Sequence, residues 1–370
     1  MNYSDIFDLI RNYHSYLSYY LGNGKALKPF RYSLELTYRC NLNCPFCYVG
    51  SLRNLNELSK EEWFGVIDQI PFWGFITLVG GEPLLRNDFL EILDKSLKKV
   101  QGRVNVVSNG ILLTEEISKH FIDKKLLLLS VSLDGYGETH DKNRNREGIF
   151  EKAVTNLKTL IDMRKGKKYP LLDIKTIVME NNLDDLVKLY QLCDELGIEF
   201  LSLSFLRNNN LKQSSNLREA FGEEFWKQDY PIKSYFDINH FKEVYGELQG
   251  LAAKGKTKLR FAPKFKENGH FQDIDNFFQD NISESTSKIY KPCLYPWSNV
   301  IINPEGEIYP CLSFKIGNVR NSSFMEVWNN KRFISFRRNL RKNKVFSSCQ
   351  MCCELTPKNI SGTKAQKKNK

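Results

Sequence analysis

Three cysteines stand close together near the start of the chain, in the segment Cys40-Asn-Leu-Asn-Cys44-Pro-Phe-Cys47. This spacing allows three thiols on a single loop to face one point. Such a loop could bind zinc, form a redox pair or hold an iron–sulfur cluster. Zinc in a closed structural site needs four protein ligands, and with no histidine nearby a distant fourth ligand would be required. A cubane cluster held by three thiolates instead leaves one iron free to bind another molecule.

The composition indicates a folded protein of one large domain with a small addition. Of its 370 residues, 41% are hydrophobic and 13% aromatic, which is enough for a buried core. No run of about 18 apolar residues predicts a transmembrane segment, and the first residues lack the pattern of a signal peptide. A cytoplasmic location is therefore expected. Because cysteines rarely pair in a reducing compartment, clustered cysteines among the nine are expected to be metal ligands or redox centres.

The formal net charge of +11 is confined to the C-terminus, since residues 331–370 hold twelve Lys or Arg and one Glu. This uneven distribution argues against a nucleic-acid partner. The basic segment could contact an acidic partner or a membrane surface. A solvated helix face followed by a disordered tail is the favoured interpretation. The basic residues concerned are Arg337, Arg338, Arg341, Lys342, Lys344, Lys364, Lys367, Lys368 and Lys370.

Short β-rich runs alternate with helical runs over residues 32–206, which predicts a parallel sheet closed or nearly closed into a barrel. The predicted strands are Tyr32–Thr37, Phe75–Val79, Val104–Ser108, Leu127–Leu133, Ile174–Met179 and Phe200–Phe205. The predicted helices are Lys60–Ile70 with a capping box at Ser59 and Glu62, Asp88–Val100, Thr114–Lys124 capped by Thr114, Gly148–Arg164 and Asp184–Leu196.

Folds of this kind carry their chemistry at the carboxyl ends of the strands. The cysteine loop follows the first predicted strand, and Gly80-Gly81-Glu82-Pro83 follows the second. Ser108-Asn109-Gly110 follows the third strand, and Asp134-Gly135 follows the fourth. These four groups are therefore expected to meet on one rim of the sheet.

The chain divides into five predicted segments. These are an N-terminal helix (1–29), the barrel (30–206), a helical insertion or linker (207–290), a cysteine-containing unit (291–356) and a basic disordered tail (357–370). The N-terminal helix, with its Tyr and Leu residues at helical spacing, could cap the barrel or lie on a membrane, and the cap is favoured because its polar face is not basic enough for strong interfacial binding. The fourth segment is expected to contain a hairpin over Val300–Tyr309 and a helix over Ser323–Leu340.

Taken together, the cysteine loop, the Gly-Gly-Glu-Pro segment and Ser132-Leu133-Asp134-Gly135 resemble the radical S-adenosylmethionine (radical SAM) enzymes. The resemblance implies an α/β fold built as a partial (β/α)6 barrel, with a C-terminal auxiliary iron–sulfur domain of the SPASM or twitch type. In that family three cysteines ligate a 4Fe-4S cluster whose free iron chelates the amino and carboxylate groups of S-adenosylmethionine. One electron then cleaves the sulfonium and yields a 5'-deoxyadenosyl radical, which abstracts hydrogen from a substrate.

The resemblance assigns the cluster ligands to Cys40, Cys44 and Cys47. It also implies a set of residues that bind S-adenosylmethionine. Gly80, Gly81, Glu82 and Pro83 would meet its amino group, Ser108 and Asn109 its ribose and carboxylate region, Ser132 and Arg144 its methionine carboxylate, and Tyr48 its adenine. Arg144 lies between Lys142 and Arg146, so the choice among these three stays open. Asn109 could be only a turn residue, and His140 could be a general base but is expected to be a structural hydrogen-bonding residue.

The C-terminal cysteines resemble the SPASM domain. Cys293, Cys311, Cys349 and Cys352 would hold one auxiliary 4Fe-4S cluster, with Cys353 as an alternative ligand, a spare residue or a catalytic thiol. Zinc would fit four cysteines equally well. Cys193, within a predicted helix, is expected to be a buried small apolar residue.

These motifs predict how a radical is made but not what it attacks. The leading hypothesis is a radical SAM oxidoreductase or maturase that modifies a peptide or protein by crosslinking, epimerisation or oxidation. The alternative is a radical enzyme acting on a small-molecule or lipid biosynthetic intermediate, and a non-catalytic iron–sulfur or zinc scaffold is a third reading. The resemblance also implies an electron donor such as flavodoxin or ferredoxin.

Overall fold

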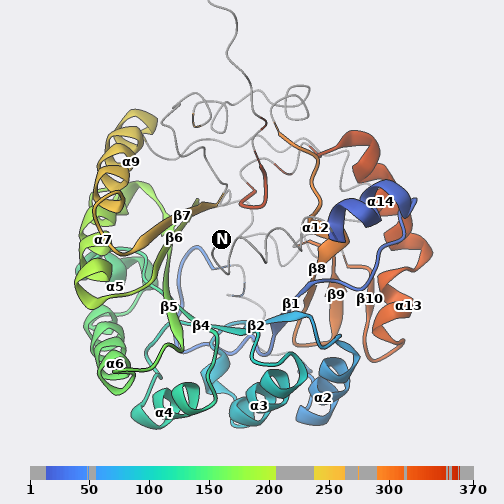
Figure 1. Ribbon diagram of the computed structural model, residues 1–370, viewed down its shortest axis with the longest axis horizontal. Helices are drawn as coiled ribbons and strands as arrows, with labels where there is room; N and C mark the ends of the chain where they lie inside the picture. The colour runs from blue at the N-terminus through green and yellow to red at the C-terminus, as the bar shows by residue number, and fades with distance from the viewer. Residues whose placement is uncertain are drawn as a thin grey trace, which may run out of the picture.

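The computed structural model describes residues 14–47, 49, 56–205, 237–262, 274, 290–311, 315–346, 349, 352–356 and 358. Its strands form one sheet in the order β10-β9-β8-β1-β2-β3-β4-β5-β6-β7 (Figure 1). The strands are β1 (Arg31–Glu35), β2 (Phe75–Val79), β3 (Val104–Ser108), β4 (Leu128–Ser132), β5 (Leu171–Val178), β6 (Phe200–Phe205), β7 (Lys258–Ala262), β8 (Asn299–Ile302), β9 (Glu307–Tyr309) and β10 (Gly317–Asn318).

Helices ring the outside of this curved sheet (Figure 1). They are α2 (Lys60–Gln69), α3 (Phe89–Lys99), α4 (Glu115–Asp123), α5 (Glu138–Arg144), α6 (Ile149–Met163), α7 (Asp185–Leu196), α9 (Ile238–Ala252), α12 (Tyr295–Ser298), α13 (Phe324–Trp328) and α14 (Lys331–Asn343). Two short 3-10 helices, η1 (Pro83–Leu85) and η2 (Glu180–Asn182), follow β2 and β5. A further helical stretch at residues 14–21 is called the N-terminal helix below.

The expected α/β partial barrel is confirmed, and β1 to β6 match the six predicted strands. Each of these strands pairs in parallel with its neighbour. The sheet extends further at both edges, where β7 pairs in parallel with β6 and β8 pairs in parallel with β1. Of the predicted helical insertion 207–290, residues 207–236 and most of 263–289 lie outside the described residues. The described part contains α9 and also β7, a strand that was not predicted, in which charged Lys258 and Arg260 alternate with Leu259 and Phe261.

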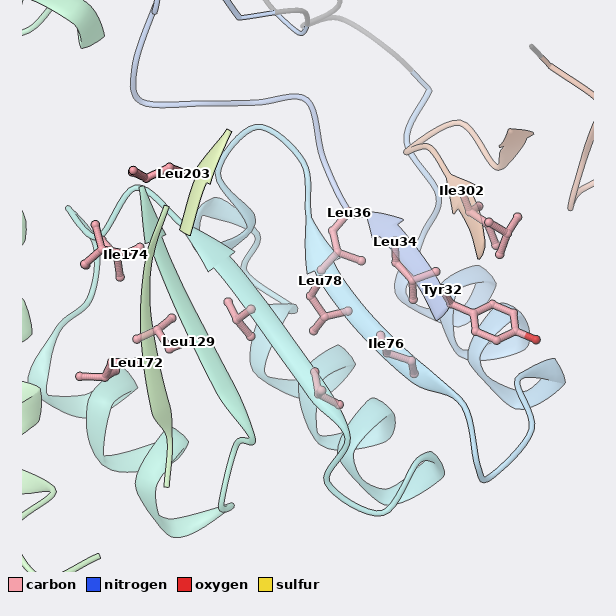
Figure 2. Packing of buried hydrophobic residues seen from close by; sticks show 14 of the residues in the cluster. Tyr32, Leu34, Leu36, Ile76, Leu78, Leu129, Leu172, Ile174, Leu203 and Ile302 are labelled. Atoms are coloured by element: carbon pink, nitrogen blue, oxygen red, sulfur yellow. The ribbon is translucent and has the colours of Figure 1, made fainter. Parts of the chain in front are cut away.

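Side-chain alternation along the strands gives the sheet two different faces. One face carries Leu34, Leu78, Leu129 and Ile174, which are buried in the main hydrophobic core (Figure 2). Helix residues such as Trp63 belong to the same cluster, so this face packs against the surrounding helices. The opposite face therefore lines the inside of the partial barrel, and its residues are largely polar.

Local signals account for several helix ends. Ser59 and Glu62 form the predicted capping box at the start of α2, and the Thr114 side chain accepts a hydrogen bond from the Ile117 amide at the start of α4. The helix predicted over 323–340 is divided in two. Asn329 and Asn330 lie between the parts, and the Asn330 side chain accepts a hydrogen bond from the amide of Phe333, which caps α14 as a new helix.

The predicted C-terminal hairpin is confirmed as β8 and β9, which pair Ile301 with Tyr309. Its turn closes where the Gly306 amide donates to the Asn303 carbonyl, with Gly306 at a φ of 80°. Since β8 also pairs with β1, the C-terminal unit continues the sheet of the barrel.

Arg337 departs from the prediction of a solvated basic face, because its side chain is fully buried. The guanidinium lies over the rings of Phe333 and Trp328, at 3.5 and 4.2 Å from their centroids. It donates hydrogen bonds to the carbonyls of Gly24, Pro296 and Trp328. Arg337 thus ties the segment after the N-terminal helix to α12 and α13, and burial lowers its pKa well below the ordinary value.

Candidate functional site

Glu82 is a fully buried acidic residue of the carboxyl rim, where β2 ends. Its carboxylate is fully buried and accepts hydrogen bonds from the Ser108 hydroxyl at 2.9 Å, the Asn109 amide at 2.8 Å and the Leu84 amide at 3.2 Å. A carboxylate offers about four acceptor positions, so one remains for a further donor. Burial raises the pKa of Glu82 to about 7, and a cationic or strongly donating ligand would favour the ionised form.

Gly80 and Gly81 allow the cysteine loop to pack against this segment. A Cβ atom on Gly80 would lie 2.3 Å from the Thr37 carbonyl oxygen, and one on Gly81 would lie 2.4 Å from that of Arg39. The Gly81 and Glu82 amides donate hydrogen bonds to the same two carbonyls. These glycines therefore have a packing role within the chain, in addition to the room for a ligand that the sequence suggested.

Asn109 connects the third strand end to the cysteine loop. Its side-chain amide donates to the Asn41 side chain at 2.7 Å, and Asn41 directly follows Cys40. Its own side-chain oxygen accepts from the Ile111 amide, as in an Asx turn. Asn109 thus has both the turn role and a contact with the loop.

Arg144 reaches the cysteine loop from α5. One guanidinium nitrogen lies 2.5 Å from the carboxylate of buried Asp134, and another lies 3.9 Å from Cys44 Sγ. The guanidinium also lies over the ring of Phe46, 5.6 Å from its centroid. Burial would lower the pKa of Arg144, but Asp134 and Cys44 outweigh this effect and the pKa is raised.

The other two basic residues of this segment have other partners, although Arg146 also reaches the backbone of the cysteine loop. Lys142 forms an exposed ion pair with Glu138, while Arg146 donates to the Asn41 carbonyl at 3.1 Å. Among the three, Arg144 is therefore the one beside a cysteine thiol.

The three loop cysteines are half-buried. Burial raises the pKa of the Cys44 thiol to about 11. The charge of Arg144 opposes this rise, and the neighbouring thiols of Cys47 and Cys40 add to it. Within the described part of the chain, no three His, Cys, Asp or Glu side chains converge closely enough to hold a single metal ion. A 4Fe-4S cluster binds each thiolate through a different iron, so its ligands need not converge on one point.

His140 has the structural role expected of it. Its Nδ1 atom accepts a hydrogen bond from the Asp134 amide at 3.0 Å. Burial, helped by the charge of Arg144, lowers the pKa of His140 to about 3, so the imidazole is neutral at physiological pH.

Ser132 ends β4 on the inner face and pairs in register with Lys175 of β5. Lys175 pairs with Ser202, which in turn pairs with Arg260 of β7. This row across four strands puts two cations on the inner face, with Lys175 next to Ser132 and Arg260 three strands away from it. Tyr48, the residue expected near adenine, lies outside the described residues.

The C-terminal cysteines form a second group. The pKa of the Cys293 thiol is raised well above its ordinary value. Burial is the main cause, and the nearby thiols of Cys349 and Cys311 raise it further. The four candidate ligands, Cys293, Cys311, Cys349 and Cys352, pack as partly buried residues against the main core. Cys353 and Cys311 both act electrostatically on Tyr295, which places Cys353 near the same group. Cys193 is fully buried in α7, as its helical position suggested.

Sequence reasoning missed several residues that hold this site. Asp134 appeared only as part of a motif, and Asn41 and Phe46 lie between the cysteines without having been singled out. Arg86 also braces the start of the cysteine loop, because it donates to the Leu36 carbonyl at 2.9 Å and pairs with Glu57. The signal in the sequence was a single arginine directly after the apolar Leu84-Leu85 that follows the Gly-Gly-Glu-Pro segment.

Comparison with known families agrees with this geometry. Residues 34–193 match the radical SAM superfamily, and residues 293–353 match the SPASM family, an iron–sulfur cluster-binding domain. The chain belongs to the radical SAM enzymes with a SPASM domain. Members use S-adenosylmethionine with a 4Fe-4S cluster, and the SPASM domain holds an auxiliary iron–sulfur cluster.

Individual relatives differ in how much of the chain they match. An AdoMet-dependent heme synthase of Methanosarcina barkeri is 29% identical over 86% of each chain. The Fe-coproporphyrin III synthase of the same organism is 33% identical over 44% of this chain and 40% of its own. The sporulation killing factor maturation protein SkfB of Bacillus subtilis is 32% identical over 48% of this chain and 42% of its own.

Among solved structures, Streptococcus suis SuiB bound to its precursor peptide SuiA has a TM-score of 0.63 at 14% identity. The match covers 90% of this chain and 72% of SuiB. It shows a shared fold.

The residues on the rim fit the cofactors that the family uses. Three thiols share one loop, and the Glu82 carboxylate keeps one acceptor position for an amino group. The Nε atom of Arg144 is buried and has no hydrogen-bond partner among the residues that the structure describes. A guanidinium donor of this kind suits a carboxylate ligand.

Proposed function

We propose that this radical SAM enzyme modifies a small-molecule intermediate, and that the intermediate is an iron porphyrin on the way to heme. The single observation that carries the proposal is the heme synthase relative, which matches 86% of both chains. A match of that extent must also include residues outside 34–193, the part of the chain that matches the radical SAM superfamily. The core makes the radical, whereas the rest of the chain must contribute to substrate choice.

Peptide modification, the leading hypothesis from sequence, has weaker support. The match to SkfB covers less than half of either chain, and the likeness to SuiB concerns the fold alone. The SkfB match is less extensive than the heme synthase match, and the SuiB likeness, although it covers 90% of this chain, has only 14% identity.

The inner face of the sheet favours an anionic substrate. Lys175 is exposed on this face, and Arg260 lies on the same row with its guanidinium 3.3 Å from the centroid of the Phe200 ring. Porphyrin intermediates carry carboxylates on a flat apolar ring, so cations beside an aromatic side chain are complementary to them. Asp173 and Glu35 are buried acids on this face, and each is held by hydroxyl donors: Ser130 and Ser202 donate to Asp173, and Tyr38 donates to Glu35.

In this proposal Cys40, Cys44 and Cys47 hold the catalytic cluster. Gly80, Gly81, Glu82, Pro83, Ser108, Asn109, Ser132, Arg144 and Tyr48 bind S-adenosylmethionine. When bound, the two cofactors supply a 5'-deoxyadenosyl radical that removes a hydrogen atom from the substrate. Cys293, Cys311, Cys349 and Cys352 hold the auxiliary cluster, with Cys353 as the alternative ligand, and a flavodoxin or ferredoxin supplies the electron.

The substrate class can be tested with the anaerobically reconstituted enzyme, S-adenosylmethionine, a reductant and Fe-coproporphyrin III. We expect substrate-dependent formation of 5'-deoxyadenosine together with a porphyrin product of altered mass. Lys175→Gln and Arg260→Gln should each raise the KM for the porphyrin about tenfold, since each removes one charged hydrogen bond. Lys152→Gln, on the exposed side of α6, is the matched control and should leave the KM unchanged. Unaltered porphyrin, with S-adenosylmethionine cleaved at the substrate-free rate, would contradict the proposal.

A further inference from the structure

Exposed apolar side chains gather on one small part of the surface. Among the described residues, seven large hydrophobic side chains are exposed, and five of them lie between residues 16 and 27. Leu21 and Tyr20 stand out, at 76% and 57% exposed. These five residues, called the N-terminal patch below, are Tyr16, Leu17, Tyr20, Leu21 and Leu27.

The N-terminal helix is firmly attached on its other side. Tyr19 is buried and packs edge-on against Trp297, with ring centroids 4.9 Å apart. The Ser18 hydroxyl accepts a hydrogen bond from the Leu27 amide, which fixes the turn after the helix. Four of the exposed residues therefore lie on the outer side of a docked helix, and Leu27 lies in the turn that follows it.

Helix α14 supplies positive charge next to the patch. The segment 331–344 holds seven Lys or Arg and no acidic residue, and of these the side chain of Arg337 alone is buried. Arg338 donates to the Asn23 carbonyl at 3.0 Å, and the Arg341 guanidinium lies 5.5 Å from the centroid of the Tyr19 ring. Figure 1 shows the N-terminal helix, in blue, beside α14. Residues 14–30 add Lys25 and Lys28, again without an acid.

The patch lies near the amino ends of the strands, whereas the candidate active site lies at their carboxyl ends. Tyr19 contacts Trp297, two residues before β8, and His14 contacts Trp73, two residues before β2. Both strands therefore begin near the N-terminal helix. Glu82 and Asp134 follow the carboxyl ends of β2 and β4. A partner bound at the patch would leave the rim open.

We propose that the N-terminal patch and α14 dock the enzyme on an anionic lipid bilayer. Exposed Leu and Tyr side chains can enter the interfacial region while Lys and Arg contact lipid phosphates. The helix alone lacks basic residues for this, as its sequence indicated, but the fold brings α14 beside it. The absence of acidic residues from both segments favours an anionic surface. No helix in the described part of the chain is long and apolar enough to cross a membrane, so the association is peripheral.

The test is co-sedimentation of the full-length holoenzyme with vesicles of phosphatidylcholine, with and without phosphatidylglycerol. We expect binding to the anionic vesicles that weakens with added salt. Leu21→Ser should weaken binding about tenfold through lost apolar contact. Arg338→Glu and Lys342→Glu should each weaken it at least about fivefold, from roughly 1 kcal/mol per basic residue.

Two exposed positions elsewhere serve as matched controls. Tyr136→Ser removes an exposed aromatic side chain near the carboxyl ends of the strands, and Lys119→Glu reverses an exposed charge on α4. Both variants should bind vesicles like the wild type. Equal binding to both vesicle types, or binding unaffected by Leu21→Ser, would overturn the proposal. Failure to bind vesicles, with a concentration-dependent dimer that Leu21→Ser abolishes, would show instead that the patch joins two copies of the chain.

Discussion

The two cysteine groups are held in different ways. The loop with Cys40, Cys44 and Cys47 is fixed by side chains from several strand ends, among them Asn109 and the Asp134–Arg144 pair. The C-terminal group is held by backbone bonds between short segments, such as the Cys293 amide to the Lys344 carbonyl and the Lys291 amide to the Thr356 carbonyl. Within the described residues, side chains from distant strand ends therefore brace the core loop, whereas backbone bonds join the segments around the auxiliary cysteines.

Removing the three loop thiols gives the largest expected effect. The variant with Cys40, Cys44 and Cys47 all changed to Ala should bind about half of the roughly eight irons expected for two 4Fe-4S clusters. Reductive cleavage of S-adenosylmethionine should fall at least about a thousandfold. Iron analysis and 5'-deoxyadenosine measurement check this, and full iron content with retained cleavage would show that the loop is not the catalytic cluster site.

Breaking the buried ion pair at the rim should cost the protein considerable stability. Asp134→Ala leaves the Arg144 guanidinium buried without its partner, so we expect the free energy of unfolding to fall by about 3–5 kcal/mol. Glu138→Ala, which removes the exposed partner of Lys142, is the control and should cost less than about 1 kcal/mol. Denaturant unfolding measures both, and equal losses would mean that the pair does not brace the site.

Arg337 and its neighbour Arg338 provide the same kind of test in the C-terminal region. Arg337→Met should lower the free energy of unfolding by about 3 kcal/mol, because several buried carbonyls lose their donor. Arg338→Met should cost less than about 1 kcal/mol at its exposed position. Iron content should drop only in the first variant, since Pro296 lies close to Cys293. If the Arg337→Met protein is destabilised but keeps its iron, the packing around α12 does not support cluster binding.

Glu82 should make a smaller, pH-dependent contribution. Its folded pKa of about 7 exceeds its ordinary value of 4.5, so the unfolded chain releases this proton first as the pH rises. The effect of Glu82 on stability is therefore absent below about pH 4.5, and it becomes a full cost of about 3 kcal/mol above pH 7. Between pH 4.5 and 7, the free energy of unfolding should therefore fall less in the Glu82→Gln variant than in the wild type, when both are measured without S-adenosylmethionine. Parallel pH profiles of the two proteins would argue against it.

The order of strands and helices could be predicted from the sequence better than the contacts between side chains. The strands β1 to β6 have strong apolar patterns, and the rim motifs follow from where those strands end. Helix α5, with the sequence Glu-Thr-His-Asp-Lys-Asn-Arg, has no apolar periodicity, so the element that carries Arg144 gave no signal. It is held by polar contacts such as the Asn143 side chain to the Asp134 carbonyl. The burial of Arg337 likewise depends on aromatic neighbours that only the tertiary fold brings around it.

The most direct test of the proposed function is the anaerobic reaction of the reconstituted enzyme with Fe-coproporphyrin III, followed by mass spectrometry of both the nucleoside and the porphyrin. We predict that 5'-deoxyadenosine and a porphyrin of altered mass form together, and that both are lost in the variant without Cys40, Cys44 and Cys47. An unaltered porphyrin, with 5'-deoxyadenosine formation no faster than in its absence, would contradict this function while leaving the radical SAM site intact.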